Sequence, residues 1–299
     1  MDVSVIMPAY NAEKYIGEAI ESVLSQRFSG SYEILIADDA STDSTPDIIR
    51  AYQSGHPERI KAIFREKNIG ANPNSYDLCL RASGRYLAFL DADDRWVSCD
   101  KLQRQFDYLE EHDNVGAVCS NAYYINNHLI GGQRKEAEGL VPFREMIDGH
   151  ADIFCSSLVC RKEIYEQMAE DSRWFVDQGC FNDTVWAFWL SYHGLLFRMS
   201  EALCSYRVLS DSACHSTDKA KQILLARKYF MKKMAFLFTH EYPLEEKMKI
   251  VSQEYDYLRE NAFFAGEMKV RNTRTFQTGK LIKALTSPFH QKKKDKWWK

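Results

Sequence analysis

Three carboxylates fall within four positions of the stretch Phe-Leu-Asp-Ala-Asp-Asp-Arg-Trp, at Asp91, Asp93 and Asp94. Like charges this close raise one another's pKa, so such a cluster calls for a function or a counter-charge. Carboxylates on a loop can bind a divalent cation, share a proton in acid–base chemistry or form a solvated turn. The cluster directly follows the apolar run 86–90, which predicts a buried strand. This position favours a binding role over a plain surface turn.

The residues after the cluster favour Mg²⁺ or Mn²⁺ over Ca²⁺. A calcium loop needs further oxygen ligands at alternate positions, a glycine at the sharp turn and a terminal glutamate. The sequence instead continues with Arg95, Trp96 and Val97. Mg²⁺ is commonly held by one or two carboxylates together with the phosphates of a substrate. A nucleoside diphosphate would supply such phosphates.

Two further polar groups follow predicted strands. Pro8 to Asn11 come after a strand expected at 3–7, where Pro8 should stop it, and Asp38 and Asp39 come after a strand expected at 33–37. In open parallel sheets, ligands bind outside the carboxyl ends of the strands. One crevice could therefore collect both groups and the carboxylate cluster.

The first 120 residues alternate short apolar runs with apolar residues at helical spacing, which predicts an open, mainly parallel α/β sheet. The predicted strands are 3–7, 33–37, 60–64 and 86–90, and the predicted helices are 12–26, one starting near 44, and 74–82. Beyond residue 120 the pattern is less regular. There we expect strands at 156–159, 195–199 and 202–206, a helix at 183–192 and helical structure from 217 to about 264.

The composition is that of an ordinary globular protein. The 299 residues are 45% hydrophobic and 27% charged, which is enough apolar material for a core. The sequence has no run of 18 apolar residues, so we expect no transmembrane helix. The N-terminus lacks the basic region of a signal peptide. Eight cysteines without a CxxC pair indicate reduced thiols rather than disulfides or zinc. We therefore expect the protein to stay in the cytoplasm.

The charge is distributed unevenly. Residues 269–299 contain ten Lys or Arg and one acid, Asp295, so this segment carries +9 and the other 268 residues carry −12. Within it, 276–299 combines a short apolar stretch with a lysine cluster, Trp297 and Trp298. Tryptophan favours the membrane interface and lysine is attracted to anionic lipid. We expect this basic amphipathic tail to hold the protein at the inner face of a membrane, with a solvated tail as the alternative and no nucleic-acid partner.

Four ordered motifs resemble those of one known family. They are VSVIMPAYNAEKYIGEAIESVLSQ, EILIADDASTDST, GRYLAFLDADDRW and KLQRQFDYLEEH. The chain resembles the family 2 glycosyltransferases of GT-A fold, continuously over about residues 1–125 and in patches over 150–215. This resemblance implies a Rossmann-like, mainly parallel sheet flanked by helices, in a GT-A domain at 1–215 with a nucleotide-sugar half (1–120) and an acceptor half (121–215). The C-terminal residues carry no motif of the family. Their helical pattern predicts a C-terminal helical appendage (216–275), which the basic amphipathic tail (276–299) follows.

The resemblance also implies a donor site. Pro8, Ala9 and Tyr10 would line the pocket for the nucleotide base, and Asp39 would accept a hydrogen bond from the base. A buried acceptor that faces a ring N–H rejects bases without that donor, which favours uracil or another base that offers an N–H there. The neighbouring Asp38, Ser41 and Asp43 can instead shape a turn and cap the next helix, an interpretation we favour for Ser41 and Asp43.

The carboxylate cluster has roles in the same resemblance. Asp91 and Asp93 would bracket the ribose and the diphosphate. Asp93 or Asp94 would ligate the metal, Mn²⁺ or Mg²⁺.

In this family, the base that activates the acceptor hydroxyl usually belongs to a Glu-Asp pair at the start of a helix. Here Asp183 matches the aspartate and Asn182 replaces the glutamate. Asp183 is therefore the expected catalytic base, and a simple helix N-cap is the alternative. Tyr206-Arg207 resembles a family Tyr-Arg pair that leads into a phosphate-facing loop, and the roles of Arg207 and His215 stay open.

The implied reaction is an inverting transfer from a nucleotide-sugar, with UDP-sugar favoured, to a saccharide or lipid-linked saccharide acceptor in the synthesis of cell-surface glycans. One alternative is a sugar-nucleotide pyrophosphorylase, which would require a Gly-rich phosphate loop after the first strand. The other is a catalytically degenerate nucleotide-binding scaffold. A dinucleotide dehydrogenase is excluded because no GxGxxG follows a strand.

Overall fold

The computed structural model describes residues 1–126, 129–133, 135–148, 153–209 and 219–253. The chain divides into two compact units, Met1–Ser216 and Thr217–Lys299. The first unit is an α/β domain, and the described part of the second is helical.

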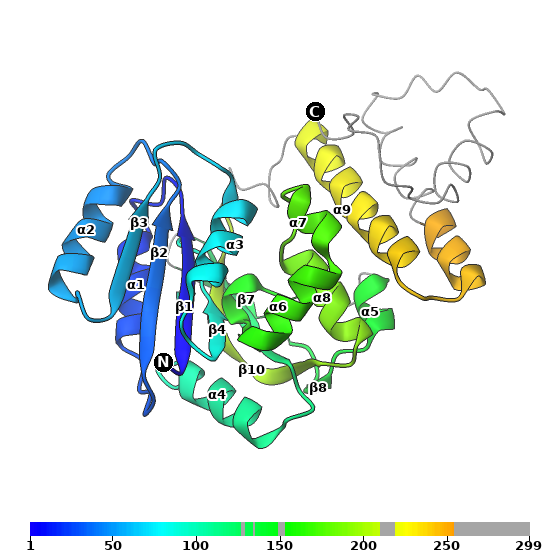
Figure 1. Ribbon diagram of the computed structural model, residues 1–299, viewed down its shortest axis with the longest axis horizontal. Helices are drawn as coiled ribbons and strands as arrows, with labels where there is room; N and C mark the ends of the chain where they lie inside the picture. The colour runs from blue at the N-terminus through cyan, green and yellow to red at the C-terminus, as the bar shows by residue number, and fades with distance from the viewer. Residues whose placement is uncertain (127–128, 134, 149–152, 210–218, 254–299) are drawn as a thin grey trace. The chain divides into compact units, whose positions relative to one another are not determined.

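The described residues of the first unit form one mixed sheet, in the order β3-β2-β1-β4-β9-β6-β10-β5, with β7 beside β6 and β8 beside β10. Figure 1 shows its strands β3, β2 and β1 side by side. The strands are β1 (Val3–Ala9), β2 (Tyr32–Asp38), β3 (Ile60–Phe64), β4 (Tyr86–Phe89), β5 (Arg95–Trp96), β6 (Ala117–Asn126), β7 (Leu129–Gln133), β8 (Gly139–Leu140), β9 (Val159–Arg161) and β10 (Leu196–Arg207). Strands β3, β2, β1 and β4 are parallel, β9 is antiparallel to both its neighbours, and β10 is parallel to β6. The predicted mainly parallel α/β sheet is confirmed.

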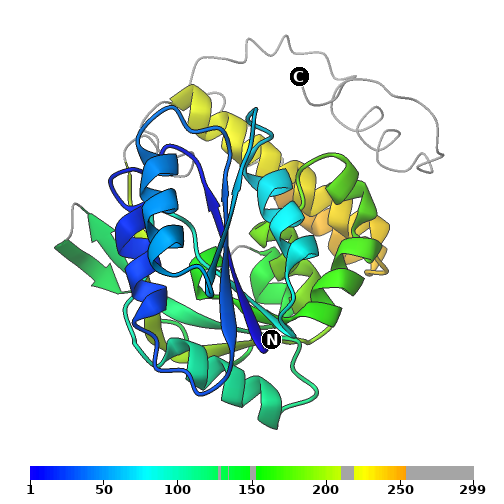
Figure 2. The same ribbon diagram turned by 60° about the vertical axis from the view of Figure 1, so that its left-hand side comes forward.

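Helices cover both faces of this sheet. Figure 2 views the first strands nearly edge-on, with α1 and α2 on one side and α3 on the other. The helices of the first unit are α1 (Ile16–Leu24), α2 (Thr45–Gly55), α3 (Ala71–Arg81), α4 (Lys101–Glu111), α5 (Phe143–Ile147), α6 (Lys162–Asp171), α7 (Arg173–Asp177) and α8 (Asp183–Tyr192), with a short 3₁₀ helix, η1 (Cys155–Ser157).

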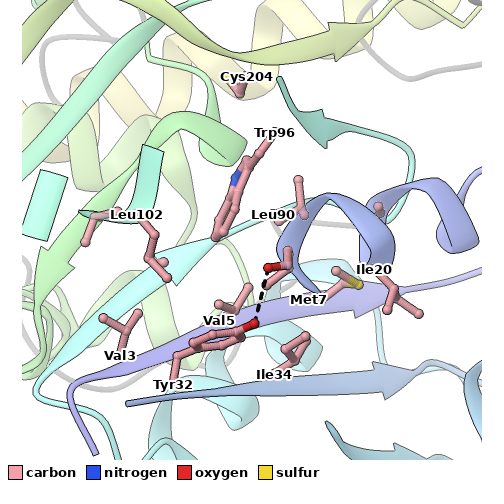
Figure 3. Packing of buried hydrophobic residues seen from close by; sticks show 14 of the residues in the cluster. Val3, Val5, Met7, Ile20, Tyr32, Ile34, Leu90, Trp96, Leu102 and Cys204 are labelled. Atoms are coloured by element: carbon pink, nitrogen blue, oxygen red, sulfur yellow. Dashed lines mark hydrogen bonds between the residues drawn. The ribbon is translucent and has the colours of Figure 1, made fainter. Parts of the chain in front are cut away.

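The central strands are buried on both faces, which explains their nearly continuous apolar sequences. Val3, Val5 and Met7 point to one face, where they pack in a cluster with Ile20 of α1 and Leu102 of α4 (Figure 3). Burying each such side chain stabilises the fold by about 1.5–3 kcal/mol. The loops at the strand ends therefore extend from a well-packed sheet.

Strand β1 runs two residues further than predicted. We expected Pro8 to stop it after Met7, but it continues to Ala9. Proline lacks a backbone N–H, so a sheet accepts it only where no partner needs that donor. Ile6, which faces the same side as Pro8, accepts the N–H of Leu90 at 3.1 Å, and β4 has already ended at that level. Pro8 therefore removes no hydrogen bond from the sheet.

Two helices differ from their predicted bounds. The helix expected at 12–26 begins only at Ile16, after a turn at 13–15, and the backbone N–H of Ala12 before this turn donates to Thr45 Oγ1 at 2.8 Å. The helix expected at 74–82 begins three residues earlier, at Ala71, after Gly70 with φ of 93°. Helix α8 has the predicted bounds.

Two strand predictions after residue 120 are wrong. Cys155–Ser157 form a 3₁₀ helix, and the strand expected at 156–159 begins only at Val159. The strands expected at 195–199 and 202–206 are one strand, β10, with register irregularities between Met199 and Cys204. These irregularities interrupt the alternation of side chains, which is why the sequence resembles two short strands.

The second unit contains α9 (Lys219–Thr239) and, after a break near Pro243, a helical segment at 244–253. Within the described residues, no helix is both long and apolar enough to cross a membrane. His215, the predicted tail 276–299 and much of the predicted appendage 216–275 lie outside the described residues.

Candidate functional site

The carboxyl ends of β1, β2 and β4 lie side by side, because β1 is the parallel neighbour of both other strands. Pro8 and Ala9 are the last residues of β1, and Ala9 pairs in register with Asp38 of β2. The N–H of Asp39 donates to the Ala9 carbonyl at 2.8 Å. On the other side, β4 ends two residues before Asp91. The structure thus brings the three predicted polar groups to one edge of the sheet.

The loops after β1 and β2 are tied to each other. Asn11, which has φ of 48°, accepts the N–H of Thr42 on its Oδ1 at 2.8 Å, and its own N–H donates to Ser41 Oγ at 2.9 Å. The Asp43 carboxylate accepts backbone N–H groups from both loops. Ser41 and Asp43 therefore shape turns, as we favoured. The side chain of Tyr10 is left half-exposed, at 51%, beside these loops.

Asp39 is buried and anchors a third loop. Its Oδ1 accepts the N–H of Ile69 and its Oδ2 accepts the N–H of Gly70, both at 2.8 Å. Each carboxylate oxygen has a second lone pair, so these two bonds leave acceptor capacity for a ligand. Asp39 thus fixes the loop that follows β3 to the end of β2, a role that the sequence motif did not reveal.

Asp94 is held by protein groups on both carboxylate oxygens. Its Oδ1 accepts the backbone N–H of Arg207 at 2.7 Å, and its Oδ2 accepts the Ser156 hydroxyl at 2.6 Å. Ser156 Oγ in turn accepts the N–H of Asp91 at 3.1 Å. Ser156 thereby fastens the carboxylate loop to η1. Of the two predicted metal ligands, Asp94 is the one whose oxygens are already engaged.

Asp91 and Asp93 have no hydrogen bond from another side chain to their carboxylates in the part of the chain that the structure describes. Burial, together with the smaller effects of the negative charges of Asp93 and Asp183, raises the pKa of Asp91 to about 7. Burial also raises the pKa of Asp93, against the opposing effect of Arg207. The site therefore carries an excess of negative charge that a bound cation would relieve.

Asp183 lies near this cluster, although it is about ninety residues away in sequence. The Cys155 thiol lies close enough to Asp91, Asp183 and Asp94 for their charges to act on it. Burial, and to a smaller extent these three negative charges, raise the pKa of this thiol well above its usual range. Asp183 is the first residue of α8, and its Oδ1 accepts the N–H of Thr184 at 2.7 Å. The alternative that Asp183 is the helix N-cap is wrong, because the preceding asparagine occupies that position.

The loop before α8 contacts the donor half of the domain. The amide of Asn72, near the start of α3, donates to the carbonyl of Gly179 at 3.1 Å. Gly179 has φ of 64°, in the left-handed region that favours glycine. The backbone that leads to Asp183 is therefore docked on α3.

Arg207 connects the end of β10 to the carboxylate loop. Its side chain is 1% exposed, its Nε donates to the Asp93 carbonyl at 2.6 Å, and its Nη2 pairs with Glu18 at 2.6 Å. Glu18 lies in α1 and pairs through its other oxygen with Arg95 at 2.6 Å. Sequence reasoning missed Glu18 and Ser156, because neither belongs to a motif and their partners are distant in the chain.

The donor set fits a divalent cation that is shared with a substrate. In the described part of the chain, no group of three His, Cys, Asp or Glu side chains could hold a metal alone. Asp91 and Asp93 nevertheless place two carboxylates beside each other at a strand end. One or two carboxylates completed by substrate phosphates are the usual arrangement for Mg²⁺.

Comparison with known proteins identifies the family. The model of glycosyl transferase family 2 matches residues 4–168, which is more than half of the chain. The chain therefore belongs to glycosyl transferase family 2, and the resemblance seen in the motifs is confirmed.

Curated relatives match over the same N-terminal part. TuaG of Bacillus subtilis, named for teichuronic acid biosynthesis, is 45% identical over 109 residues, 36% of this chain and 42% of its own length. The Escherichia coli protein WfgD, a UDP-Glc:α-D-GlcNAc-diphosphoundecaprenol β-1,3-glucosyltransferase, is 37% identical over 131 residues, 44% of this chain and 49% of its own length. The chain thus spans less than half the length of either relative.

Solved structures share the fold over nearly the whole chain. S. aureus TarS 1–349 in complex with UDP-GlcNAc has a TM-score of 0.64 at 18% identity, covering 93% of this chain and 78% of its own. The mannosyltransferase PcManGT from Pyrobaculum calidifontis, in complex with GDP-Man and Mn²⁺, has a TM-score of 0.59 at 19% identity, covering 94% and 80%. The fold is the GT-A fold, as predicted.

Proposed function

We propose that this protein transfers a sugar from a UDP-sugar to a saccharide or lipid-linked saccharide acceptor, with inversion at the anomeric carbon, in the synthesis of a cell-surface glycan. The observation that carries this proposal is the meeting of three carboxylate groups at one edge of the sheet. These groups are Asp39, the pair Asp91 and Asp93, and Asp183. Together they supply the parts that a nucleotide-sugar transfer requires: a base reader, a diphosphate site and a proton acceptor.

The donor would bind across the ends of β1, β2 and β4. The ring of Tyr10 is half-exposed and has room to stack on a base, while Pro8 and Ala9 form the floor between the two neighbouring strands. Asp39 would accept the N–H of the base with its remaining lone pairs. The Asp39 carboxylate cannot donate, so a base that offers an acceptor there would be rejected. This requirement supports uracil.

The diphosphate would lie over the carboxylate loop, with Asp93 as the metal ligand and Asp91 beside the ribose. Asp94 takes a supporting role in this proposal, since both of its oxygens hold protein groups. A bound Mn²⁺ or Mg²⁺ would neutralise the charge that develops on the leaving diphosphate. The structure of PcManGT with GDP-Man and Mn²⁺ supports a cation in this fold.

Asp183 would act on the acceptor. Its carboxylate takes the proton of the acceptor hydroxyl while the hydroxyl oxygen forms a bond to the anomeric carbon. The bond from that carbon to the diphosphate oxygen breaks in the same displacement, so the configuration inverts. No covalent intermediate with the protein forms, and no nucleophilic serine or cysteine is needed.

A ligand-binding experiment tests the donor class. Thermal unfolding of the purified protein should be measured with UDP, GDP and dTDP, each with and without Mn²⁺. A ligand that binds the native state raises the melting temperature by mass action. We expect UDP with Mn²⁺ to stabilise the protein most and to lose this effect in Asp39→Ala. A larger effect of GDP would contradict the choice of uracil.

A lipid-linked acceptor would lie at a membrane, so the proposal includes a membrane role for the segment 276–299, which lies outside the described residues. Its lysines and its two tryptophans suit an anionic membrane surface. We expect truncation after Thr275 to release the protein from anionic liposomes at low salt and to preserve donor hydrolysis. Continued co-sedimentation of the truncated protein would exclude this segment as the anchor.

A further inference from the structure

Arg207 contacts the carboxylate loop through both its backbone and its side chain, although no step of the proposed reaction requires it. Its backbone N–H binds Asp94, its Nε binds the Asp93 carbonyl, and its Nη2 pairs with Glu18. Its guanidinium also lies 4.3 Å from the centre of the Tyr15 ring. One residue of β10 thus bonds to two consecutive residues of the loop 91–95 and fixes both to α1.

The burial of this side chain separates a positioning role from direct contact with a substrate. The Arg207 side chain is 1% exposed. Its Nη1 is buried and has no hydrogen-bond partner within the described residues. Burying a charged group with one nitrogen unpaired costs free energy, which the other bonds of the side chain must offset. A guanidinium that is covered on all sides can act on a ligand only through the groups that it holds.

Glu18 completes the arrangement from the opposite side. Its Oε2 pairs with Arg207 and its Oε1 with Arg95, both at 2.6 Å. Arg95 directly follows the carboxylate cluster and begins β5, which pairs with β10. The Glu18 carboxylate of α1 therefore binds both Arg207 at the end of β10 and Arg95 at the end of the loop 91–95.

We propose, on the basis of the proposed function, that Arg207 and Glu18 are positioning residues that hold the loop 91–95 in the conformation that receives the cation and the diphosphate. Groups that orient metal ligands from outside the coordination sphere typically contribute 10–100-fold to metal affinity. The two nitrogens that Arg207 uses point to different partners, the Asp93 carbonyl and the Glu18 carboxylate. Lysine has a single nitrogen and cannot replace both bonds.

Substitution of Arg207 distinguishes this role from a purely electrostatic one. Removing a positive charge beside Asp93 should strengthen cation binding if only charge matters. If Arg207 instead orders the loop, Arg207→Gln should weaken Mn²⁺ binding by about tenfold or more. Arg207→Lys should weaken binding as well, although it keeps the charge. The Mn²⁺ dissociation constant can be measured with UDP present from the EPR signal of free Mn²⁺.

Hydrogen exchange provides a second measurement that needs no metal or donor. Amides in 91–96 should exchange faster in Arg207→Gln and in Glu18→Gln than in the wild-type protein. Glu18→Gln also serves if Arg207→Gln fails to fold, because the Glu18 side chain is 29% exposed and its substitution is conservative. Arg104→Gln is the matched control, since Arg104 pairs with Glu201 of the same strand β10 on an exposed surface.

The two measurements separate the outcomes. Faster exchange in 91–96 together with weaker Mn²⁺ binding in Arg207→Gln and Glu18→Gln, but not in Arg104→Gln, supports the positioning role. Wild-type exchange in both variants, or tighter Mn²⁺ binding in Arg207→Gln, would overturn it. If the wild-type protein binds no Mn²⁺ with UDP, the proposed function fails, and the exchange rates still decide whether Arg207 orders the loop.

Discussion

The rings of Phe89 and Trp186 lie 4.7 Å apart, centre to centre, with their planes tilted by 42°. Phe89 ends β4, two residues before Asp91, and Trp186 belongs to α8, three residues after Asp183. Both aromatic side chains are almost completely buried. This contact connects the strand that precedes the proposed diphosphate site to the helix that carries the proposed base, and Tyr165 packs against both rings.

Substitution of Trp186 should therefore affect turnover more than donor binding. Trp186 Nε1 has no hydrogen-bond partner within the described residues, so Trp186→Phe loses packing and no hydrogen bond. We expect this variant to fold, to keep its UDP dissociation constant and to lose kcat, because displacement of a catalytic group by about 1 Å can cost 10²-fold. Trp186→Ala should also lose about 3–5 kcal/mol of unfolding free energy.

Trp189→Phe is the control for this prediction. Trp189 lies in the same helix and donates to Asp171 at 3.1 Å. Its substitution should lower stability, measured by urea unfolding, and spare kcat. Equal losses of kcat in Trp186→Phe and Trp189→Phe would mean that general destabilisation of α8, and not the contact with Phe89, controls turnover.

Asp183→Asn tests the proton acceptor. An asparagine keeps the size of the side chain but cannot take a proton, so kcat should fall by about 10² or more. Binding of UDP with Mn²⁺ should change much less than kcat, because Asp183 lies on α8 and the proposed donor site lies at the ends of β1, β2 and β4. Steady-state kinetics and a UDP titration provide both values. A variant that loses stability but retains turnover would assign Asp183 a role in the start of α8 alone.

Asp93 and Asp94 should respond differently to substitution by alanine. Asp94→Ala leaves the Arg207 N–H and the Ser156 hydroxyl without their acceptor, and each buried unsatisfied donor costs about 1–3 kcal/mol. Asp93→Ala removes no such bond and should melt close to the wild-type temperature while losing Mn²⁺-dependent activity. Calorimetry together with activity at saturating Mn²⁺ checks this. Equal melting temperatures for the two variants would argue against a supporting role for Asp94.

Glu33 lies near the start of β2, at the end opposite to the candidate site, and we expect it to make the unfolding free energy depend on pH. Burial alone would raise the pKa of Glu33, but hydrogen bonds from Lys61, Ser83 and Ser4 outweigh burial and lower the pKa to about 2. Because the folded pKa lies below the unfolded value near 4.5, the stabilisation is complete above that value and is lost as the pH falls towards 2. Its full size is roughly 3 kcal/mol.

The comparison with Glu33→Gln isolates this effect. At pH 7 the variant should have a lower unfolding free energy than the wild-type protein, as measured with urea. The difference should narrow as the pH falls from about 5 to 3. A difference that stays constant over this interval would show that the carboxylate of Glu33 contributes through its shape and not its charge.

The parallel half of the fold could be predicted because its signals are local. Strand β4 is a continuous apolar run, and the helix from Thr45 to Gly55 begins with proline near its first position. Such patterns depend on neighbours in sequence. The mainly parallel sheet then follows from the alternation of strands and helices.

The remaining elements depend on partners that are distant in the chain. The sequence around Ser156 reads as a strand, but the side chain of Ser156 bonds to Asp94, 62 residues away, and the backbone forms a turn there. The pairing of Glu18 with Arg207 spans 189 residues. No spacing rule relates such residues, so the loop's carboxylates were predicted and the groups that hold them were not.

The central claim is that this site splits a UDP-sugar with the help of a divalent cation. The most direct measurement is the release of UDP from a panel of UDP-sugars by the purified protein with Mn²⁺, compared with EDTA and with Asp93→Asn. We predict release from at least one UDP-sugar with Mn²⁺, and none with EDTA or from the variant. Release that is equally fast in EDTA, or release of UDP from none of the donors, would contradict the claim.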